Sequence, residues 1–248
     1  MVSMKITVLI TIAVLYLLQL PAQQHKPGML TIQFKNTYNG QPVQLYDSLY
    51  SNGMNEQFEL RKLKYYVGQV QLAGNAIQPQ YYLINQQDSA SWYFTIPVNP
   101  GKYEQLSFLL GVDSSSNTSG AQTGALDPLN DMYWTWQSGY VMIKIEGTSP
   151  QSTTANNKME YHLGGYSGPY KVQQRINLPF SFGQLLHIQP GKNTTVTIQL
   201  QLEKFWQQPG VKNIAAQPVC NTPGLLARQL ALAFGHLFSI YHTAQPAQ

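Results

Sequence analysis

Apolar and polar residues alternate with a period of two along most of the chain after residue 27, which is typical of half-buried β-strands. In the first such segment Leu30, Ile32 and Phe34 alternate with polar neighbours. In the second, the apolar positions are 63, 65 and 67, and after Gly68 the phase moves to 70 and 72. A phase shift at a glycine is typical of a β-bulge. Further strands are predicted over residues 81–84, 106–112, 140–146, 159–163, 174–178 and 196–202.

Clusters of Gly, Pro and Asn separate these segments, for example at residues 39–40, 99–101 and 189–191. Eight or more strands with turn signals between them favour a sandwich or a barrel. We therefore predict an all-β fold, an antiparallel two-sheet β-sandwich, with a barrel as the alternative.

One short C-terminal helix is predicted to follow Thr222 and to continue until Gly235, because apolar residues recur at helical spacing from Leu225 onward. Thr222 is the expected N-cap, and Pro223 suits the first turn. A short apolar strand is predicted over residues 237–241. We find no internal repeat and no linker, so residues 23–242 are expected to form one domain, followed by a disordered tail over residues 243–248.

The first 22 residues have the pattern of a secretory signal peptide. Lys5 precedes an apolar run from Ile6 to Leu20, and Pro21-Ala22 ends it before a polar stretch. A membrane anchor is the alternative, but the run is shorter than the roughly 20 residues that a spanning helix needs. We expect cleavage near Ala22, a mature chain without a transmembrane segment, and a periplasmic or extracellular location.

Composition agrees with an exported globular domain. Apolar residues make up 43% of the chain, which is enough for a core, whereas charged residues make up only 10%, against a usual value of about 25%. The net charge is +4 and the basic residues are scattered, so the clustered basic face of a nucleic-acid-binding protein is not expected.

Cys220 is the only cysteine, which excludes an internal disulfide and a cysteine-based metal cluster. A small buried apolar role is expected for it.

The pattern richest in functional signals lies between residues 111 and 165. It contains in order Gly111-Val112-Asp113, Gly124-Ala125-Leu126-Asp127-Pro128, Met132-Tyr133-Trp134-Thr135-Trp136, Gly139-Tyr140, Lys144-Ile145-Glu146-Gly147 and Tyr161-His162-Leu163-Gly164-Gly165. In order and spacing these motifs resemble the MbnP-like family of copper-binding proteins, and weaker similarity extends over nearly all of the mature chain. The resemblance implies an exported protein that takes up, stores or delivers copper. It also implies a tryptophan oxidised to kynurenine by a partner di-haem oxidase, with that kynurenine and histidines in the copper site.

Trp134 and Trp136 are the tryptophans of this pattern. They are two residues apart on an extended segment, so their rings are expected on the same face, roughly 7 Å apart. From the residues alone they suit a core plug, a sugar-stacking platform or an oxidisable site. The resemblance makes them the candidates for modification and for a place in the copper site.

His162 is the first candidate metal ligand. In its predicted strand Met159, Tyr161 and Leu163 alternate to one side, which leaves His162 and Glu160 on the other. Imidazole nitrogen is a common copper donor. The alternative is a structural histidine that is hydrogen-bonded to a neighbouring loop.

No histidine lies near the two tryptophans in the sequence, so a second copper donor would have to come from His187 or from the amino terminus. Cleavage after Ala22 would leave Gln23-Gln24-His25 at the new terminus. An amine, two backbone amides and the His25 imidazole can surround Cu(II) in a square plane. Cleavage elsewhere, or cyclisation of Gln23, would abolish that site.

Asp113, Asn117 and Asp127 lie in a Gly- and Ser-rich segment that offers oxygen donors, so calcium is a second candidate ion there. Asx-turns made by the same side chains are the alternative. Searches for a G-x-S-x-G elbow, an H-E-x-x-H motif and a Walker loop fail, and we predict that the protein is not an enzyme. Two functions remain: copper binding, and a non-catalytic module that binds a glycan or protein partner through Trp134 and Trp136.

Overall fold

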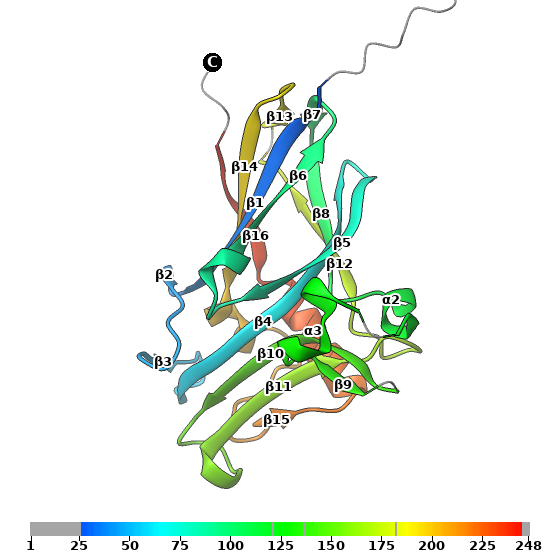
Figure 1. The fold of residues 1–248 in the computed structure, drawn as a ribbon. Coiled ribbons are helices and arrows are strands. Elements are labelled where there is room, and N and C mark those ends of the chain that lie inside the picture. Colours follow the sequence, from blue (N-terminus) through cyan, green and yellow to red (C-terminus); the bar gives the residue numbers. More distant parts are fainter. Residues whose placement is uncertain (1–25, 121, 136, 182, 245–248) are drawn as a thin grey trace, which may run out of the picture.

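The computed structural model describes residues 26–244 except 121, 136 and 182, and this part of the chain forms two packed sheets (Figure 1). In the described residues the first sheet has five strands, in the order β16-β14-β1-β2 with β6 also paired to β1. These strands are β1 (Gly28–Tyr38), β2 (Gln41–Pro42), β6 (Tyr93–Val98), β14 (Asn193–Gln201) and β16 (Phe238–Ala244).

The second sheet has nine strands within the same described residues, in the order β12-β8-β4-β10-β11-β15, with β3 and β5 paired to β4 and β9 paired to β10. Its strands are β3 (Leu49–Ser51), β4 (Gln57–Leu72), β5 (Asn75–Asn85), β8 (Gln105–Leu110), β9 (Tyr133–Thr135), β10 (Gly139–Thr148), β11 (Lys158–Gly164), β12 (Gln174–Pro179) and β15 (Val219–Cys220). A separate pair joins β7 (Gly101–Tyr103) to β13 (Leu186–Ile188).

Helices occupy little of the chain. The α-helices in the described residues are α2 (Ser114–Thr118) and α3 (Leu225–Gly235). Short 3₁₀ turns are η1 (Ser89–Trp92), η2 (Gly124–Leu126), η3 (Pro128–Asn130), η4 (Ala155–Asn157) and η5 (Leu202–Gln207). The all-β prediction with one short C-terminal helix is confirmed.

The core lies between the two sheets, and its aromatic rings join them. Leu30, Ile32 and Phe34 are buried on the inner face of β1, as their alternation predicts. The Phe34 ring meets Tyr65 of β4 edge-on at a centroid distance of 5.9 Å. Helix α3 closes this core with Phe234, whose ring lies 5.7 Å from Tyr65. Such edge-to-face pairs add to the stabilisation from burying apolar area.

The sheets are mixed, which corrects the prediction of a purely antiparallel sandwich. Strands β1 and β14 run parallel, from Met29 beside Asn193 to Thr37 beside Gln201. Strands β11 and β15 also pair in parallel. Parallel neighbours need a long crossover, and here every described strand of the second sheet except β15 lies between β1 and β14 in the sequence. The local alternation of apolar and polar residues does not show a pairing between strands so far apart in the sequence.

The β-bulge predicted at Gly68 is confirmed. The pairing of β4 shifts between Gly68 and Val70 against β5 and between Gly68 and Gln71 against β8, and Gln69 has a φ of 46°. A Cβ on Gly68 would lie 2.4 Å from the Tyr81 ring, so glycine is needed there for the close approach of that ring. The bulge moves the inward-facing phase from Val67 to Val70.

Two predictions about chain ends are corrected. Helix α3 is capped by Gly224, without a side-chain hydrogen bond, so Thr222 is not its N-cap. Strand β16 extends to Ala244, and Thr243 pairs with Val196, so residues 243 and 244 belong to a strand and not to the predicted tail. The longer strand satisfies more of the backbone groups at the edge of β14.

The predicted signal peptide, residues 1–22, lies outside the described residues. Within residues 26–244, gaps excepted, no helix has the length and apolarity needed to span a membrane.

Candidate metal centre

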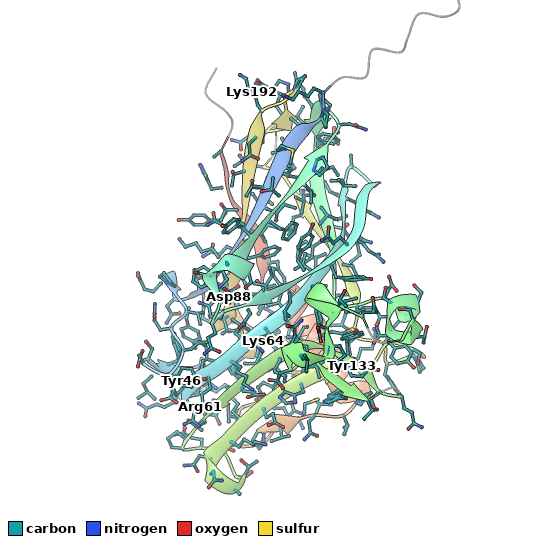
Figure 2. All side chains as sticks on the ribbon, viewed as in Figure 1. Tyr46, Arg61, Lys64, Asp88, Tyr133 and Lys192 are labelled. Atoms are coloured by element: carbon teal, nitrogen blue, oxygen red, sulfur yellow. The ribbon has the colours of Figure 1, made fainter. Side chains whose placement is uncertain are left out.

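Three neighbouring strands place ionisable side chains in two rows on the outer face of the second sheet. In the first row Lys64 of β4, Lys144 of β10 and His162 of β11 are cross-strand neighbours. Figure 2 labels Lys64, the β4 member of this row. In the second row the corresponding residues are Lys62, Glu146 and Glu160. Because successive residues of a strand point to opposite faces, the apolar residues between them fill the core.

His162, Glu146 and Glu160 form the candidate metal centre. Nε2 of His162 lies 2.8 Å from Oε1 of Glu146. One potential ligand atom from each of the three residues lies within 4.8 Å of the others. All three side chains are largely buried: that of His162 is 14% exposed, that of Glu146 21% and that of Glu160 12%. The orientation predicted from the alternation of β11, with His162 and Glu160 facing away from the core, is confirmed.

Lysine side chains compensate the two carboxylates. Nζ of Lys62 lies 3.2 Å from Oε2 of Glu146, and Nζ of Lys158 lies 2.7 Å from Oε2 of Glu160. Lys62 also pairs with Asp131 at 2.8 Å, and Lys144 pairs with the same carboxylate at 3.0 Å. The centre is therefore part of a continuous network of ion pairs, and an incoming metal ion would have to compete with ammonium groups for it.

The network of ion pairs keeps the carboxylates of Glu146 and Asp131 ionised. Burial would raise the pKa of Glu146, but the hydrogen bond with His162 and the charge of Lys62 outweigh burial and lower the pKa to about 2. Burial opposes ionisation of Asp131 as well, and hydrogen bonds from Lys62 and Lys144 lower its pKa to about 2. Glu146 is thus a permanent hydrogen-bond acceptor for His162 at ordinary pH, so that Nε2 carries the proton of their bond.

Trp134 lies beside the centre. It belongs to β9, which pairs with β10 through Tyr133 and Thr135. A Cβ on Gly164 would lie 2.4 Å from Cζ3 of the Trp134 indole, so the ring rests directly on the backbone of β11 at Gly164. Gly164 is two residues from His162 and therefore on the same face of that strand. This contact explains the glycine after Tyr161-His162-Leu163, and it puts an indole on the strand face of the candidate ligand, two residues further along β11.

An aromatic layer supports this indole. The Tyr133 and Tyr140 rings are 4.9 Å apart between centroids, and Tyr66 of β4 meets Tyr140 at 5.7 Å. Asn117 of α2 fixes the start of β10, because its Oδ1 accepts a hydrogen bond from the Tyr140 backbone at 2.9 Å. Trp134 is therefore half-buried on a rigid support rather than displayed on a flat exposed face.

The other predicted copper donors are not brought to this centre. His187 is on β13, at the opposite end of the molecule from β11 (Figure 1). A site shared by His162 and His187 within one chain is therefore excluded. His25 and Trp136 lie outside the described residues.

The predicted calcium ligands make hydrogen bonds to nearby backbone groups. Asp113 caps α2 by accepting a hydrogen bond from the Ser116 backbone at 2.7 Å, and Asp127 caps η3 through the Leu129 backbone at 2.9 Å. Nδ2 of Asn117 donates to the Val112 and Asp113 carbonyls. The local-turn alternative accounts for Asp113 and Asp127, whereas Asn117 links α2 to the start of β10. Calcium binding at Asp113, Asn117 and Asp127 stays a prediction.

Sequence reasoning missed Glu146 and Glu160 as partners of His162. Glu160 shares the face of His162, which the alternation of β11 already indicated. Glu146 required the register of β10 on β11, where it opposes Glu160. The signal that would have found it is the acidic residue in Lys144-Ile145-Glu146-Gly147, on a strand adjacent to His162.

The fold and the centre define a mixed two-sheet β-sandwich with one histidine, two carboxylates and a tryptophan on the outer face of one sheet. The MbnP family model matches residues 27–222, so the chain belongs to the MbnP family. Among solved structures, MbnP from Methylosinus trichosporium superposes with a TM-score of 0.52 at 16% sequence identity, over 79% of this chain and 83% of that one. At that identity the likeness shows a common fold. No curated protein matches the sequence significantly.

Proposed function

We propose that this MbnP-family protein is an exported, non-catalytic copper-binding protein whose copper centre is built on His162. The observation that carries the proposal is the convergence of His162, Glu146 and Glu160 on the outer face of β10 and β11, with ligand atoms within 4.8 Å of one another. Copper would serve as cargo to be stored or delivered, so the residues need to bind and release it.

The donor set fits Cu(II) better than Cu(I). One imidazole nitrogen with carboxylate oxygens suits the tetragonal nitrogen–oxygen environment that Cu(II) prefers, whereas Cu(I) prefers thiolate or thioether sulfur. The Cys220 thiol cannot contribute, because it is buried on β15 and burial raises its pKa to about 11. The proposal is therefore for Cu(II), held by His162 and Glu160.

Glu146 has a different role from Glu160 in this proposal. Histidine ligands commonly donate their second ring N–H to a carboxylate, which fixes the tautomer and orients the ring. The 2.8 Å contact from Nε2 of His162 to Glu146 has this form. It leaves Nδ1 of His162 with the free lone pair. Glu146 is accordingly a positioning residue, and Nδ1 is the nitrogen that would bind copper.

The ion pairs around the centre predict a modest, salt-dependent affinity. Glu160 is paired with the exposed Lys158, and water screens such a surface pair so that it contributes little to stability. Copper can therefore displace Lys158 at small cost. A site from which Lys158 is easily displaced, and which has few strong donors, suits the transfer of copper better than its permanent storage.

Calorimetric titration of the chain with Cu(II) tests the proposal. The mature chain should carry His25→Ala, so that the amino terminus does not form its own square-planar site. In that background we expect one Cu(II) per chain, a loss of at least about tenfold in affinity for His162→Ala, and a loss of about 10–100-fold for Glu146→Gln. His187→Ala is the matched control and should bind as the parent does. Equal affinity in the parent and His162→Ala would refute the site.

The proposal extends to Trp134. Its indole lies on the same strand face as His162, which is the placement that a kynurenine ligand formed by a partner di-haem oxidase would require. Intact-mass spectrometry and metal analysis of protein from its native host test this extension. An oxidised Trp134 with copper retained supports it; a mass equal to that of the plain mature sequence, without copper, opposes it.

A further inference from the structure

A cavity lies on the first sheet, away from the candidate metal centre. It encloses about 340 Å³, within the range of about 300–1,000 Å³ typical of small-molecule sites. Its walls come from β1, β14, β16, β2 and η1. Asp88, labelled in Figure 2, marks the start of η1. The lining residues are Gln33, Phe34, Lys35, Asn36, Pro42, Gln86, Trp92, Thr197, Tyr241 and His242.

Trp92 and Tyr241 are among the aromatic residues that line this cavity. Tyr241 of β16 is 54% exposed, although it is a large ring on a paired strand. Trp92 ends η1 and is held in place by a hydrogen bond from Nε1 to the Asn85 carbonyl at 3.0 Å. A fixed indole and an exposed phenol offer apolar ring faces to a ligand that is itself a ring.

The polar groups of the cavity include amide and ammonium donors, and its lining contains no carboxylate. Asn36 and Gln86 are only 5% and 8% exposed. Nδ2 of Asn36 donates one hydrogen bond to Gln86, and Nε2 of Gln86 donates one to the Val43 carbonyl. A primary amide has two N–H groups, so within the described residues each amide keeps one N–H without a partner.

A positive charge lies at the same cavity. Nζ of Lys35 lies 4.3 Å from the centroid of the Tyr241 ring and pairs with no carboxylate in the described residues. Nearby, Gln33 accepts a hydrogen bond from Thr197 through Oε1, at 3.2 Å, and keeps its own N–H groups. The cavity therefore combines ring faces, unused amide donors and one cation.

We propose that this cavity binds an acidic sugar, a pyranose ring that bears a carboxylate. The C–H face of a pyranose packs on an aromatic ring, its hydroxyl oxygens accept hydrogen bonds from the amides of Asn36, Gln86 and Gln33, and its carboxylate pairs with Lys35. A neutral sugar would offer no carboxylate to pair with Lys35. A flat aromatic acid would offer no hydroxyl oxygens to accept hydrogen bonds from the amides. The site is independent of the copper proposal.

Chemical-shift titration of the ¹⁵N-labelled chain with glucuronic acid, glucose and benzoate tests the assignment. Glucuronic acid should shift the Trp92 indole resonance and the backbone resonances of residues 33–36 and 241–242, and should bind about tenfold more tightly than glucose. Lys35→Gln should reduce glucuronic acid to the affinity of glucose, and Tyr241→Ala should weaken both sugars. Tyr241 is 54% exposed and Lys35 is partly exposed, so neither substitution removes a side chain of the buried core.

Tyr170→Ala removes another exposed tyrosine outside the cavity and should leave all three affinities unchanged. The proposal is overturned if glucuronic acid shifts none of these resonances. It is also overturned if benzoate binds as tightly as glucuronic acid, or if Lys35→Gln leaves the preference for glucuronic acid over glucose intact.

Discussion

His162 and Glu146 form a diagonal cross-strand pair, with Nε2 of the imidazole 2.8 Å from Oε1 of the carboxylate. Glu146 directly opposes Glu160 on the neighbouring strand, and His162 opposes Lys144. Diagonal neighbours in a sheet are within reach of long side chains. Since Lys62 holds the other oxygen of Glu146 at 3.2 Å, the carboxylate has one defined orientation, and the ring of His162 is fixed by it.

The first prediction concerns the tautomer of His162 in the metal-free protein. Because ionised Glu146 accepts from Nε2, the neutral ring should carry its proton on Nε2, which leaves Nδ1 for a metal. Long-range ¹H–¹⁵N correlation spectra in mildly alkaline solution measure this directly. Glu146→Ala should abolish the preference, whereas Glu160→Gln should preserve it. A proton on Nδ1 in the parent protein would show that Glu146 does not set the tautomer.

A second prediction follows from the Trp134 indole on the Gly164 backbone. In Gly164→Ala the new methyl group would lie 2.4 Å from the indole and 2.8 Å from the Tyr140 carbonyl. The ring must move, at an expected cost of about 1–3 kcal/mol in the free energy of unfolding. Urea unfolding and tryptophan fluorescence measure both effects.

Gly53→Ala is the matched control for that substitution, because its added methyl group would meet only Gln207, at 3.8 Å. It should leave the free energy of unfolding and the fluorescence unchanged. If Gly164→Ala behaves like this control, the placement of Trp134 against β11 is wrong.

A third prediction concerns Asp113, the N-cap of α2. Burial opposes ionisation of Asp113, but hydrogen bonds from Tyr81 and from the Ser116 backbone lower its pKa from 3.8 to about 2. A carboxyl whose pKa is depressed in the folded state stabilises the protein above its unfolded pKa, and this contribution is lost as the pH falls through the folded pKa. The contribution of Asp113 should therefore be complete above pH 3.8 and disappear toward pH 2.

Asp113→Ala tests this dependence. The substitution should lower the free energy of unfolding by about 0.5–2 kcal/mol at neutral pH, the usual value of an N-cap. The difference between parent and variant should shrink as the pH is lowered from 3.8 to 2. Chemical denaturation at several pH values measures it. A difference that is constant with pH would mean that the ionised carboxylate is not what stabilises the cap.

Much of the fold was predictable because alternation reports which face of a strand is buried. It identified the inner face of β1, the bulge at Gly68 and the outward direction of His162. It could not identify the parallel pairing of β1 with β14, because that pairing depends on strands separated by most of the chain. The α3 cap was misjudged because Thr222 precedes the helix by too many residues, and Gly224 occupies the cap position.

The candidate site was predictable only in part, for a related reason. His162 was found from its own strand, and the motif pattern pointed to Trp134. Their proximity depends on Gly164, where the absence of a side chain lets the indole approach β11. Glu146 comes from a different strand, and its contact with His162 depends on the register between β10 and β11. Such contacts between strands are set by tertiary packing.

The most direct test of the central claim is pulsed electron paramagnetic resonance of the Cu(II)-loaded chain in the His25→Ala background. If His162 is the copper ligand, the spectrum should show the remote nitrogen of one imidazole bound to copper, and this signal should vanish in His162→Ala while it persists in His187→Ala. An imidazole signal that survives His162→Ala would contradict a copper centre on the outer face of β10 and β11.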